Sequence, residues 1–166
     1  MERILVIGCP GAGKSTLSRQ LGEKLGLPVI HLDRLFWKPG WVESTREEFD
    51  ARLLAQLEHP RWIIDGNYTR TYPQRLAKCD TVIHLDFNRF ACLWGVISRV
   101  LKNYGQVRPD MPEGCPERFD WEFLKWVWNF NRTHRPRNLA ALEAAEGITV
   151  ITLKNRRQGQ EFLRQL

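Results

Sequence analysis

The feature that most constrains the fold of this chain is a glycine-rich stretch between a short apolar run and an amphipathic helical pattern. Residues 3–8 (RILVIG) read as a β-strand, and leucines recur every four residues from Leu17 to Leu25, on one face of a helix. Between them, residues 8–15 (GCPGAGKS) match the pattern G-x-x-x-x-G-K-S/T in full. A strand, a loop of this pattern and a helix, in this order, predict a phosphate-binding P-loop.

Each part of this loop has a physical task in binding a nucleoside triphosphate. Glycines permit positive φ and let backbone N–H groups approach phosphate oxygens, and the start of the following helix adds free donors. We expect Lys14 to reach the β- and γ-phosphates, and the hydroxyl of Ser15 to ligate Mg²⁺. The residues expected to bind ATP are Gly8, Pro10, Gly11, Ala12, Gly13, Lys14, Ser15 and Thr16.

Short apolar runs alternate with helical patterns along the rest of the chain, which is typical of a parallel sheet covered by helices. Ser44 and Glu47 have the spacing of a capping box at the start of one of these helices. We predict an α/β P-loop NTPase fold with a five-stranded parallel sheet, in a single domain over residues 1–166. The four further predicted strands are residues 29–32, 62–65, 81–86 and 148–153.

The charge distribution narrows the possible partners. The formal net charge is +6, and residues 88–137 alone hold nine Lys and Arg against five Asp and Glu. A cationic half suits an anionic partner, either a polyphosphate nucleotide or a nucleic acid. No apolar run has the length of a membrane span and no signal peptide is visible, so we expect a cytoplasmic protein with reduced cysteines and no membrane partner.

Acidic residues follow three of the predicted strands, and ligands of open α/β sheets lie beyond the carboxyl ends of strands. Asp65 follows the apolar run WII, as a carboxylate that organises Mg²⁺ would, and acts on the metal through water. Asp33 follows the second run and is placed to orient an acceptor hydroxyl or accept its proton. Turn or capping roles are the alternative for both, and Asp86 is interpreted as structural.

Several arginines flank the least regular part of the chain, residues 103–117. Positive side chains that close over a migrating phosphoryl group accelerate its transfer, so Arg99, with Arg132 or Arg135, is predicted to neutralise that charge. A solvated surface role is the alternative for each of them. The aromatic residues Phe36, Trp37, Trp41 and Tyr68 are candidates to line an acceptor pocket, whereas Trp121, Trp126 and Trp128 are interpreted as core and lid packing.

The segments GCPGAGKST, HLDRLFWKPGW, WIIDGNYTRT, RPDMPEGCPERFDWEFLKWVW and FNRTHRPRN together resemble the adenylate kinase-like P-loop proteins of the bacterial DNA topology modulation family. The resemblance covers nearly the whole chain. It implies a nucleoside-monophosphate-kinase fold with strand order 2-3-1-4-5, an acceptor-binding insertion over residues 33–60 and a lid over residues 100–132. Arg99 stands where such kinases keep an arginine before the lid.

The chain also departs from the adenylate kinase pattern, and the departures bear on its acceptor. Residues 67–70 (NYTR) follow the Asp-Gly of the third strand in place of Phe-Pro-Arg, and Gly95 stands where related kinases often carry arginine. An aspartate after the second strand resembles small hydroxyl-substrate kinases. The predicted function is therefore ATP- and Mg²⁺-dependent phosphoryl transfer to a small-molecule acceptor whose identity stays open.

Two other functions are compatible with the same residues. One is a nucleotide-switched regulatory NTPase that associates with nucleic acid, although no helix-turn-helix, zinc-finger or RNP-type motif is present. The other is ATP hydrolysis without an acceptor.

Overall fold

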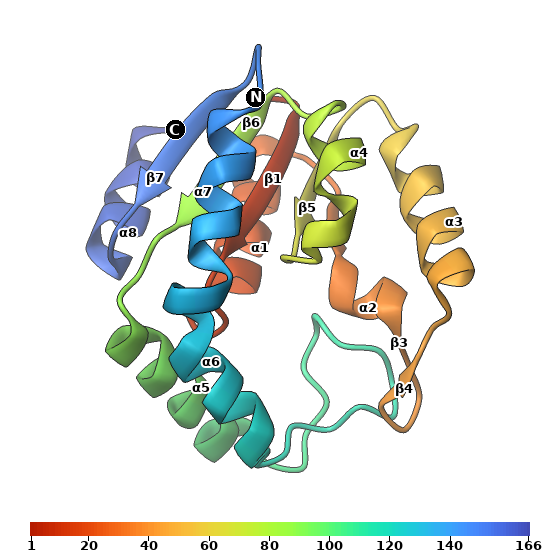
Figure 1. Ribbon diagram of the computed structural model, residues 1–166, viewed down its shortest axis with the longest axis vertical. Coiled ribbons are helices and arrows are strands. Elements are labelled where there is room, and N and C mark those ends of the chain that lie inside the picture. Colours follow the sequence, from red (N-terminus) through yellow and green to blue (C-terminus); the bar gives the residue numbers. More distant parts are fainter.

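A five-stranded parallel sheet organises the computed structural model, which describes residues 1–166 (Figure 1). Its strand order is β2-β5-β1-β6-β7. Counted along the chain this is the predicted order 2-3-1-4-5, so the predicted fold class is confirmed. The strands are β1 Arg3–Gly8, β2 Val29–His31, β5 Trp62–Asp65, β6 Thr81–Leu85 and β7 Thr149–Leu153.

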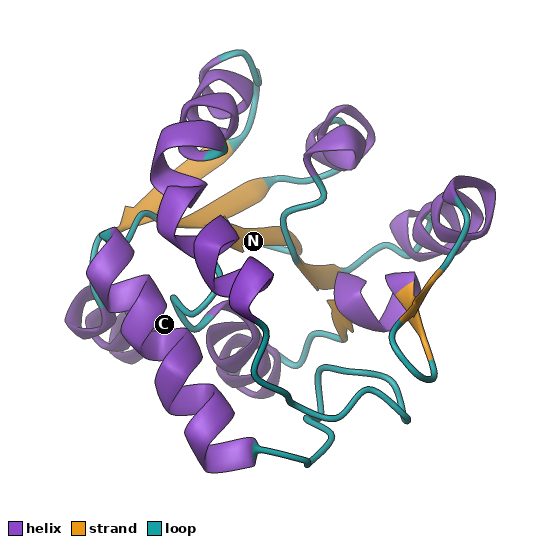
Figure 2. Cartoon of the chain, turned by 60° about the horizontal axis from the view of Figure 1, so that its bottom comes forward, coloured by secondary structure: helices purple, strands orange, loops and turns teal.

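Helices cover both faces of this sheet (Figure 2). They are α1 Lys14–Leu25, α2 Leu32–Phe36, α3 Arg46–Leu57, α4 Tyr72–Leu76, α5 Arg89–Asn103, α6 Trp121–Thr133, α7 Arg135–Glu143 and α8 Arg156–Gln165. A short hairpin of β3 Trp37–Lys38 and β4 Val42–Glu43 follows α2, and a 3-10 turn spans Thr69–Thr71. No helix combines the length and the apolar character needed to cross a membrane.

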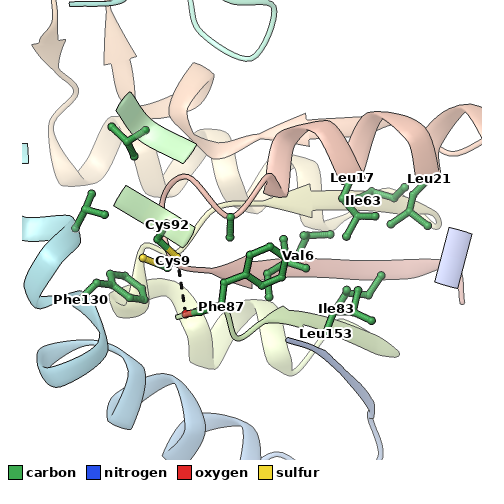
Figure 3. Close-up of a cluster of buried hydrophobic side chains, with 14 of the residues drawn as sticks. Val6, Cys9, Leu17, Leu21, Ile63, Ile83, Phe87, Cys92, Phe130 and Leu153 are labelled. Atoms are coloured by element: carbon green, nitrogen blue, oxygen red, sulfur yellow. Dashed lines mark hydrogen bonds between the residues drawn. The ribbon is translucent and has the colours of Figure 1, made fainter. Parts of the chain in front are cut away.

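The side chains of β1 alternate between two separate cores, because successive residues of a strand point to opposite faces. Ile4 and Val6 belong to the core against α1, α5 and α6, part of which is drawn in Figure 3. Leu5 and Ile7 belong to the core against α3, α4 and α7. The strand that leads into the phosphate loop is therefore packed on both of its faces, which fixes the position of its carboxyl end.

One local sequence prediction, the capping box of α3, is wrong by one residue in register. The capping box of α3 is made by Thr45 and Glu48: the Thr45 hydroxyl accepts from the Glu48 N–H at 3.2 Å, and the Glu48 carboxylate accepts from the Thr45 N–H at 2.9 Å. Ser44 lies one residue earlier in the turn, where its own N–H donates to the Phe36 carbonyl and its hydroxyl to the Leu35 carbonyl. Because Ser44 uses its polar groups on the carbonyls of Leu35 and Phe36, the next residue, Thr45, caps the helix.

The tryptophans of α6 lie on its outer surface, so the core part of their interpretation as core and lid packing is wrong. Trp121 is 61% exposed, Trp126 36% and Trp128 38%. The face of α6 that packs inward carries Leu124, Val127 and Phe130, which recur at helical spacing. The aromatic content of the helix is therefore divided between a buried stripe and an exposed face.

Candidate nucleotide and acceptor site

The phosphate loop connects the end of β1 to the start of α1, where the sequence placed it. Gly11 and Gly13 have φ of 83° and 97°, in the left-handed region that favours glycine. A Cβ at Gly13 would have no neighbouring atom within 4 Å, so this part of the loop faces open space. The loop thus presents its backbone and the first turn of α1 to a ligand, as a phosphate cradle requires.

The opposite side of the loop packs against α5 with no room for a side chain. A Cβ at Gly11 would lie 2.1 Å from the carbonyl oxygen of Cys92, and a Cβ at Gly95 would lie 2.1 Å from that of Gly11. The two backbones are therefore in direct contact. Gly95, which the sequence showed as a departure from related kinases, is the residue that lets α5 approach the loop.

Lys14 folds back onto the loop that precedes it. Its ammonium donates hydrogen bonds to the carbonyls of Gly8 at 2.9 Å and Cys9 at 3.1 Å. Burial lowers the pKa of Lys14, and the nearby groups of Cys9, Asp65 and Asp33 act in the opposite direction. The structure thus brings the predicted phosphate-binding lysine close to both predicted carboxylates.

Asp33 lies in the first turn of α2, since β2 ends at His31. Its Oδ1 accepts a hydrogen bond from the hydroxyl of Tyr68 at 2.7 Å. Burial raises the pKa of Asp33, which the Tyr68 hydrogen bond partly offsets. A carboxylate in this setting is a better proton acceptor than a solvated one.

Asp65 is the last residue of β5 and is buried. Its Oδ2 lies 2.9 Å from Nδ1 of His31, at the end of the adjacent strand. His31 was interpreted as a satisfied interior histidine, and this contact confirms that interpretation. The Asp65 carboxylate is thus held in one orientation at the carboxyl edge of the sheet.

Asn67 joins the turn after β5 to the phosphate loop, a contact that the sequence analysis missed. Its Nδ2 donates to the Gly8 carbonyl at 2.8 Å, and its Oδ1 accepts from the Gly8 N–H at 3.1 Å. The sequence identified Asn67 only as a departure from the Phe-Pro-Arg pattern. The side-chain amide of an asparagine holds both a donor and an acceptor, so it can bond the carbonyl and the N–H of the same residue. The residue type at position 67 was therefore the only sequence signal for this contact.

The loop between α5 and α6, residues 104–120, makes up the irregular part of the predicted lid and holds a buried ion network. Glu117 pairs with Arg99 at 3.1 Å and with Arg108 at 2.7 Å, and Arg108 pairs with Asp110 at 2.7 Å. Arg108 also lies near enough to Asp33 to influence its pKa. Arg99 was predicted from its place before the irregular segment, whereas no sequence pattern pointed to Arg108, which lies inside that segment.

The other two arginines predicted to neutralise the migrating charge, Arg132 and Arg135, differ in their surroundings. Arg132 is exposed near the end of α6 and has no ion-pair partner. Arg135 at the start of α7 forms a bidentate pair with Asp86, at 2.6 and 2.8 Å. Asp86 follows β6, and its pairing agrees with its interpretation as a structural residue.

The loop of residues 104–120 contacts the β3–β4 hairpin, below the sheet in the view of Figure 1. The Gly40 N–H donates to the Gly114 carbonyl at 2.8 Å, and Nε1 of Trp41 donates to the Pro116 carbonyl at 3.2 Å. Above the hairpin, the Phe36 ring contacts that of Tyr68, with centroids 5.1 Å apart. Aromatic side chains and the loop therefore bound the space around Asp33.

The residues present fit a nucleoside triphosphate with Mg²⁺. The open side of Gly13 leaves space for phosphate oxygens, and the Lys14 ammonium lies beside the loop that would hold them. The Ser15 hydroxyl and the Asp65 carboxylate are hard oxygen donors, the kind that Mg²⁺ prefers. The fold and this site together define a P-loop nucleotide-binding protein with a kinase-like architecture.

Comparison with known proteins agrees with this class. A family model described as an AAA domain matches residues 4–88, about half of the chain, and the chain belongs to that family. The matched region runs from β1 through the phosphate loop and the turn after β5 to the start of α5.

Adenylate kinases resemble part of the chain in sequence. That of Mycobacterium leprae (strain Br4923) is 32% identical over 85 residues, which is 48% of this chain and 42% of the relative. That of Mycobacterium ulcerans (strain Agy99) is 50% identical over 36 residues, 22% of this chain and 20% of the relative. The chain therefore matches less than half the length of these curated relatives.

Solved structures resemble the whole chain in fold. A shikimate kinase from Acinetobacter baumannii, in complex with shikimate, has a TM-score of 0.64 and 15% identity, covering 99% of this chain and 90% of its own. A shikimate kinase from Bacteroides thetaiotaomicron has a TM-score of 0.59 and 19% identity, covering 99% and 95%. At these identities the likeness establishes the fold alone.

Proposed function

We propose that this protein transfers the γ-phosphoryl group of ATP to a hydroxyl group of a small molecule. The observation that carries the proposal is the position of Asp33, which lies near Lys14 of the phosphate loop with its carboxylate held by Tyr68. A carboxylate beside the phosphate site is the group that an acceptor hydroxyl needs as a proton acceptor or an orienting partner. The shikimate kinase-like fold supports an acceptor of low molecular mass.

The positions of the loop residues support the following roles. ATP bound with Mg²⁺ would supply the phosphoryl group and neutralise part of its charge. Lys14 holds the phosphate oxygens, and Ser15 and Asp65 hold the metal, Asp65 through water. The remaining contacts to the nucleotide come from the loop residues Gly8, Pro10, Gly11, Ala12, Gly13 and Thr16.

We assign Arg99, Arg132 and Arg135 to charge neutralisation around the migrating group. Arg132 is free to do so from its exposed position. Arg99 and Arg135 would exchange Glu117 and Asp86 for phosphate oxygens. The release of Arg99 from Glu117 requires residues 104–120 to move when the nucleotide binds.

The experiment that tests this function measures ADP formation from ATP and Mg²⁺ with nucleoside monophosphates, nucleosides and small polyols as acceptors. We expect one acceptor class to yield a phosphorylated product over many turnovers. Lys14→Ala should lower that turnover at least about a hundredfold while leaving the melting temperature unchanged, because it removes a charge at the developing negative centre. Lys78→Ala, which alters an exposed lysine remote from the loop, is the control. Unchanged turnover in Lys14→Ala would sink the mechanism.

A second candidate is a nucleotide-switched regulator that associates with nucleic acid, as the resemblance to topology modulation proteins implied. One observation favours it: the outer surface of α5 and α6 exposes Phe90 and Trp94, and the Arg89 guanidinium lies 4.8 Å from the Trp128 ring centroid. Exposed rings beside cations are typical of surfaces that bind single strands. Retention of DNA that falls steeply with salt, without turnover on any acceptor, would favour this candidate.

A further inference from the structure

Arg75 is a fully buried arginine without an acidic partner, and no sequence motif pointed to it. Its side chain lies in α4 and is 0% exposed. None of the ion pairs of the chain includes it, and its guanidinium lies 4.8 Å from the centroid of the Tyr72 ring. Burial lowers its pKa to about 10, which leaves the guanidinium charged at neutral pH. A buried cation is expensive, so its hydrogen bonds need an explanation.

All of those hydrogen bonds go to one turn. Nη1 donates to the Gly66 carbonyl at 2.9 Å, and Nη2 donates to the carbonyls of Asn67 and, at 3.2 Å, Tyr68. Nε donates to Oγ1 of Thr71 at 2.9 Å. The planar fork of an arginine thus gathers three successive carbonyls that would otherwise repel one another.

The backbone of this turn needs such support. Gly66 has φ of 130° and Tyr68 has φ of 34°, a conformation that a non-glycine residue rarely adopts. Gly66 also packs so tightly that a Cβ would lie 2.9 Å from Cβ of Leu32. The backbone at Tyr68 is therefore strained, and the Arg75 guanidinium is the side chain that bonds all three carbonyls of the turn.

The side chains of the same turn reach both halves of the site. Asn67 satisfies the N–H and the carbonyl of Gly8 in the phosphate loop, and the Tyr68 hydroxyl donates to Asp33. We propose that Arg75 is a positioning residue that couples the phosphate loop to Asp33 through the turn of Gly66, Asn67 and Tyr68. The turnover consequence of this role rests on the proposed function; the geometric consequence does not.

The test begins with Arg75→Lys, which keeps the charge but replaces the fork with a single ammonium. We expect the affinity for ATP and Mg²⁺, measured by calorimetry, to fall about tenfold, the effect of losing one well-placed hydrogen bond to the loop. Asn67→Ala should cause a similar loss, and the double variant should lose no more than either single one. Additive losses, or a wild-type affinity in Arg75→Lys, would overturn the coupling.

Two further variants separate positioning from general stability. Tyr68→Phe should leave ATP affinity unchanged, because Tyr68 serves Asp33 and not the loop. Val82→Ala in β6 truncates a buried side chain that lies outside the turn and makes none of the hydrogen bonds of the turn, and it destabilises the fold. At temperatures well below unfolding it should bind ATP as tightly as the wild type. An equal loss of affinity in Val82→Ala would assign Arg75 to stability alone.

A crystal structure of Arg75→Lys gives a readout that does not depend on activity. The Asn67 amide should no longer lie within hydrogen-bond distance of Gly8; retention of both contacts would overturn the proposal. If Arg75→Lys fails to fold, Thr71→Val removes the acceptor of Nε, together with the hydrogen bond that the Thr71 hydroxyl donates to the Tyr68 carbonyl, and should show the same changes to a smaller degree. If the wild type binds no ATP, the proposed function fails, and the crystal structure still decides the role of Arg75.

Discussion

At the scale of single residues, Asp33 has a carboxyl group whose surroundings disfavour its charged form. Its carboxyl is partly buried, and burial raises its pKa more than the Tyr68 hydrogen bond lowers it. Asp86, which follows β6, has the opposite environment, because the Arg135 hydrogen bond holds its pKa below the usual range. The two aspartates should therefore affect stability with opposite signs.

We predict that Asp33→Asn raises the melting temperature at pH 7.5 by about 2–4 °C, for a gain of about 1 kcal/mol in the free energy of unfolding. A raised pKa in the folded state means that stability is lost as pH rises through it, so the gain should shrink as pH falls toward the ordinary aspartate pKa. Asp86→Asn should instead lower the melting temperature at pH 7.5, with the deficit shrinking toward acid. Calorimetric melts from pH 4 to 8 measure both; a gain in Asp33→Asn that grows toward acid contradicts the assignment.

At the scale of elements, the closest contact of the site is that of α5 with the phosphate loop. Gly11 and Gly95 meet backbone to backbone, and Cys9 and Cys92 lie side by side at the same junction (Figure 3). The curvature of the loop therefore depends on how closely α5 can approach. Helix propensity alone would disfavour a glycine at this position, so the packing explains its presence.

Gly95→Ala is predicted to weaken ATP binding about tenfold and to destabilise the fold by about 1–3 kcal/mol, since its Cβ would overlap the Gly11 carbonyl. The matched control is Gly159→Ala in α8, where a Cβ meets no atom within 4 Å. That change should stabilise the fold by about 0.5–1 kcal/mol through helix propensity. Calorimetry and chemical denaturation give both quantities, and equal effects of the two substitutions would refute the packing argument.

At the scale of the whole molecule, two segments outside the sheet contact each other beyond one end of the sheet. The β3–β4 hairpin leaves after α2, and residues 104–120 leave between α5 and α6, yet the two meet through Gly40 and Gly114. The loop is held at its base by the pairs of Glu117 with Arg99 and Arg108. Because removal of the Glu117 carboxylate leaves Arg99 unpaired and Arg108 with Asp110 alone, this network should control how the end of the molecule opens.

We expect Glu117→Gln to raise amide hydrogen exchange across residues 104–120 and also across the hairpin, because both segments share the contact that the loop makes. Exchange in β1 and β6 should stay at the wild-type level. Glu113→Gln changes an exposed carboxylate in the same loop that has no ion pair, and should leave both segments unaltered. Faster exchange in the loop with an unchanged hairpin would show that the two segments open independently.

The architecture was largely predictable because its signals are local. The strand before Gly8, the helix that begins at Lys14 and the apolar runs that form β5 and β6 follow from residue periodicity, and the sheet order followed from the family resemblance. The short elements between Leu32 and Glu43, together with α4, escaped prediction. Elements of two to five residues have too few positions to show a period, and tertiary contacts decide their conformation.

The sequence by itself determined the phosphate loop, because backbone conformation and the lysine and hydroxyl it needs all lie within nine consecutive residues. Only the tertiary structure decided the rest of the site. Asn67 reaches Gly8 across 59 positions of sequence, Tyr68 reaches Asp33 across 35, and Arg75 holds the turn that carries both. Such contacts arise because the carboxyl ends of β1, β2 and β5 lie together at one edge of the sheet. Local sequence patterns do not show which side chains at these strand ends will contact each other.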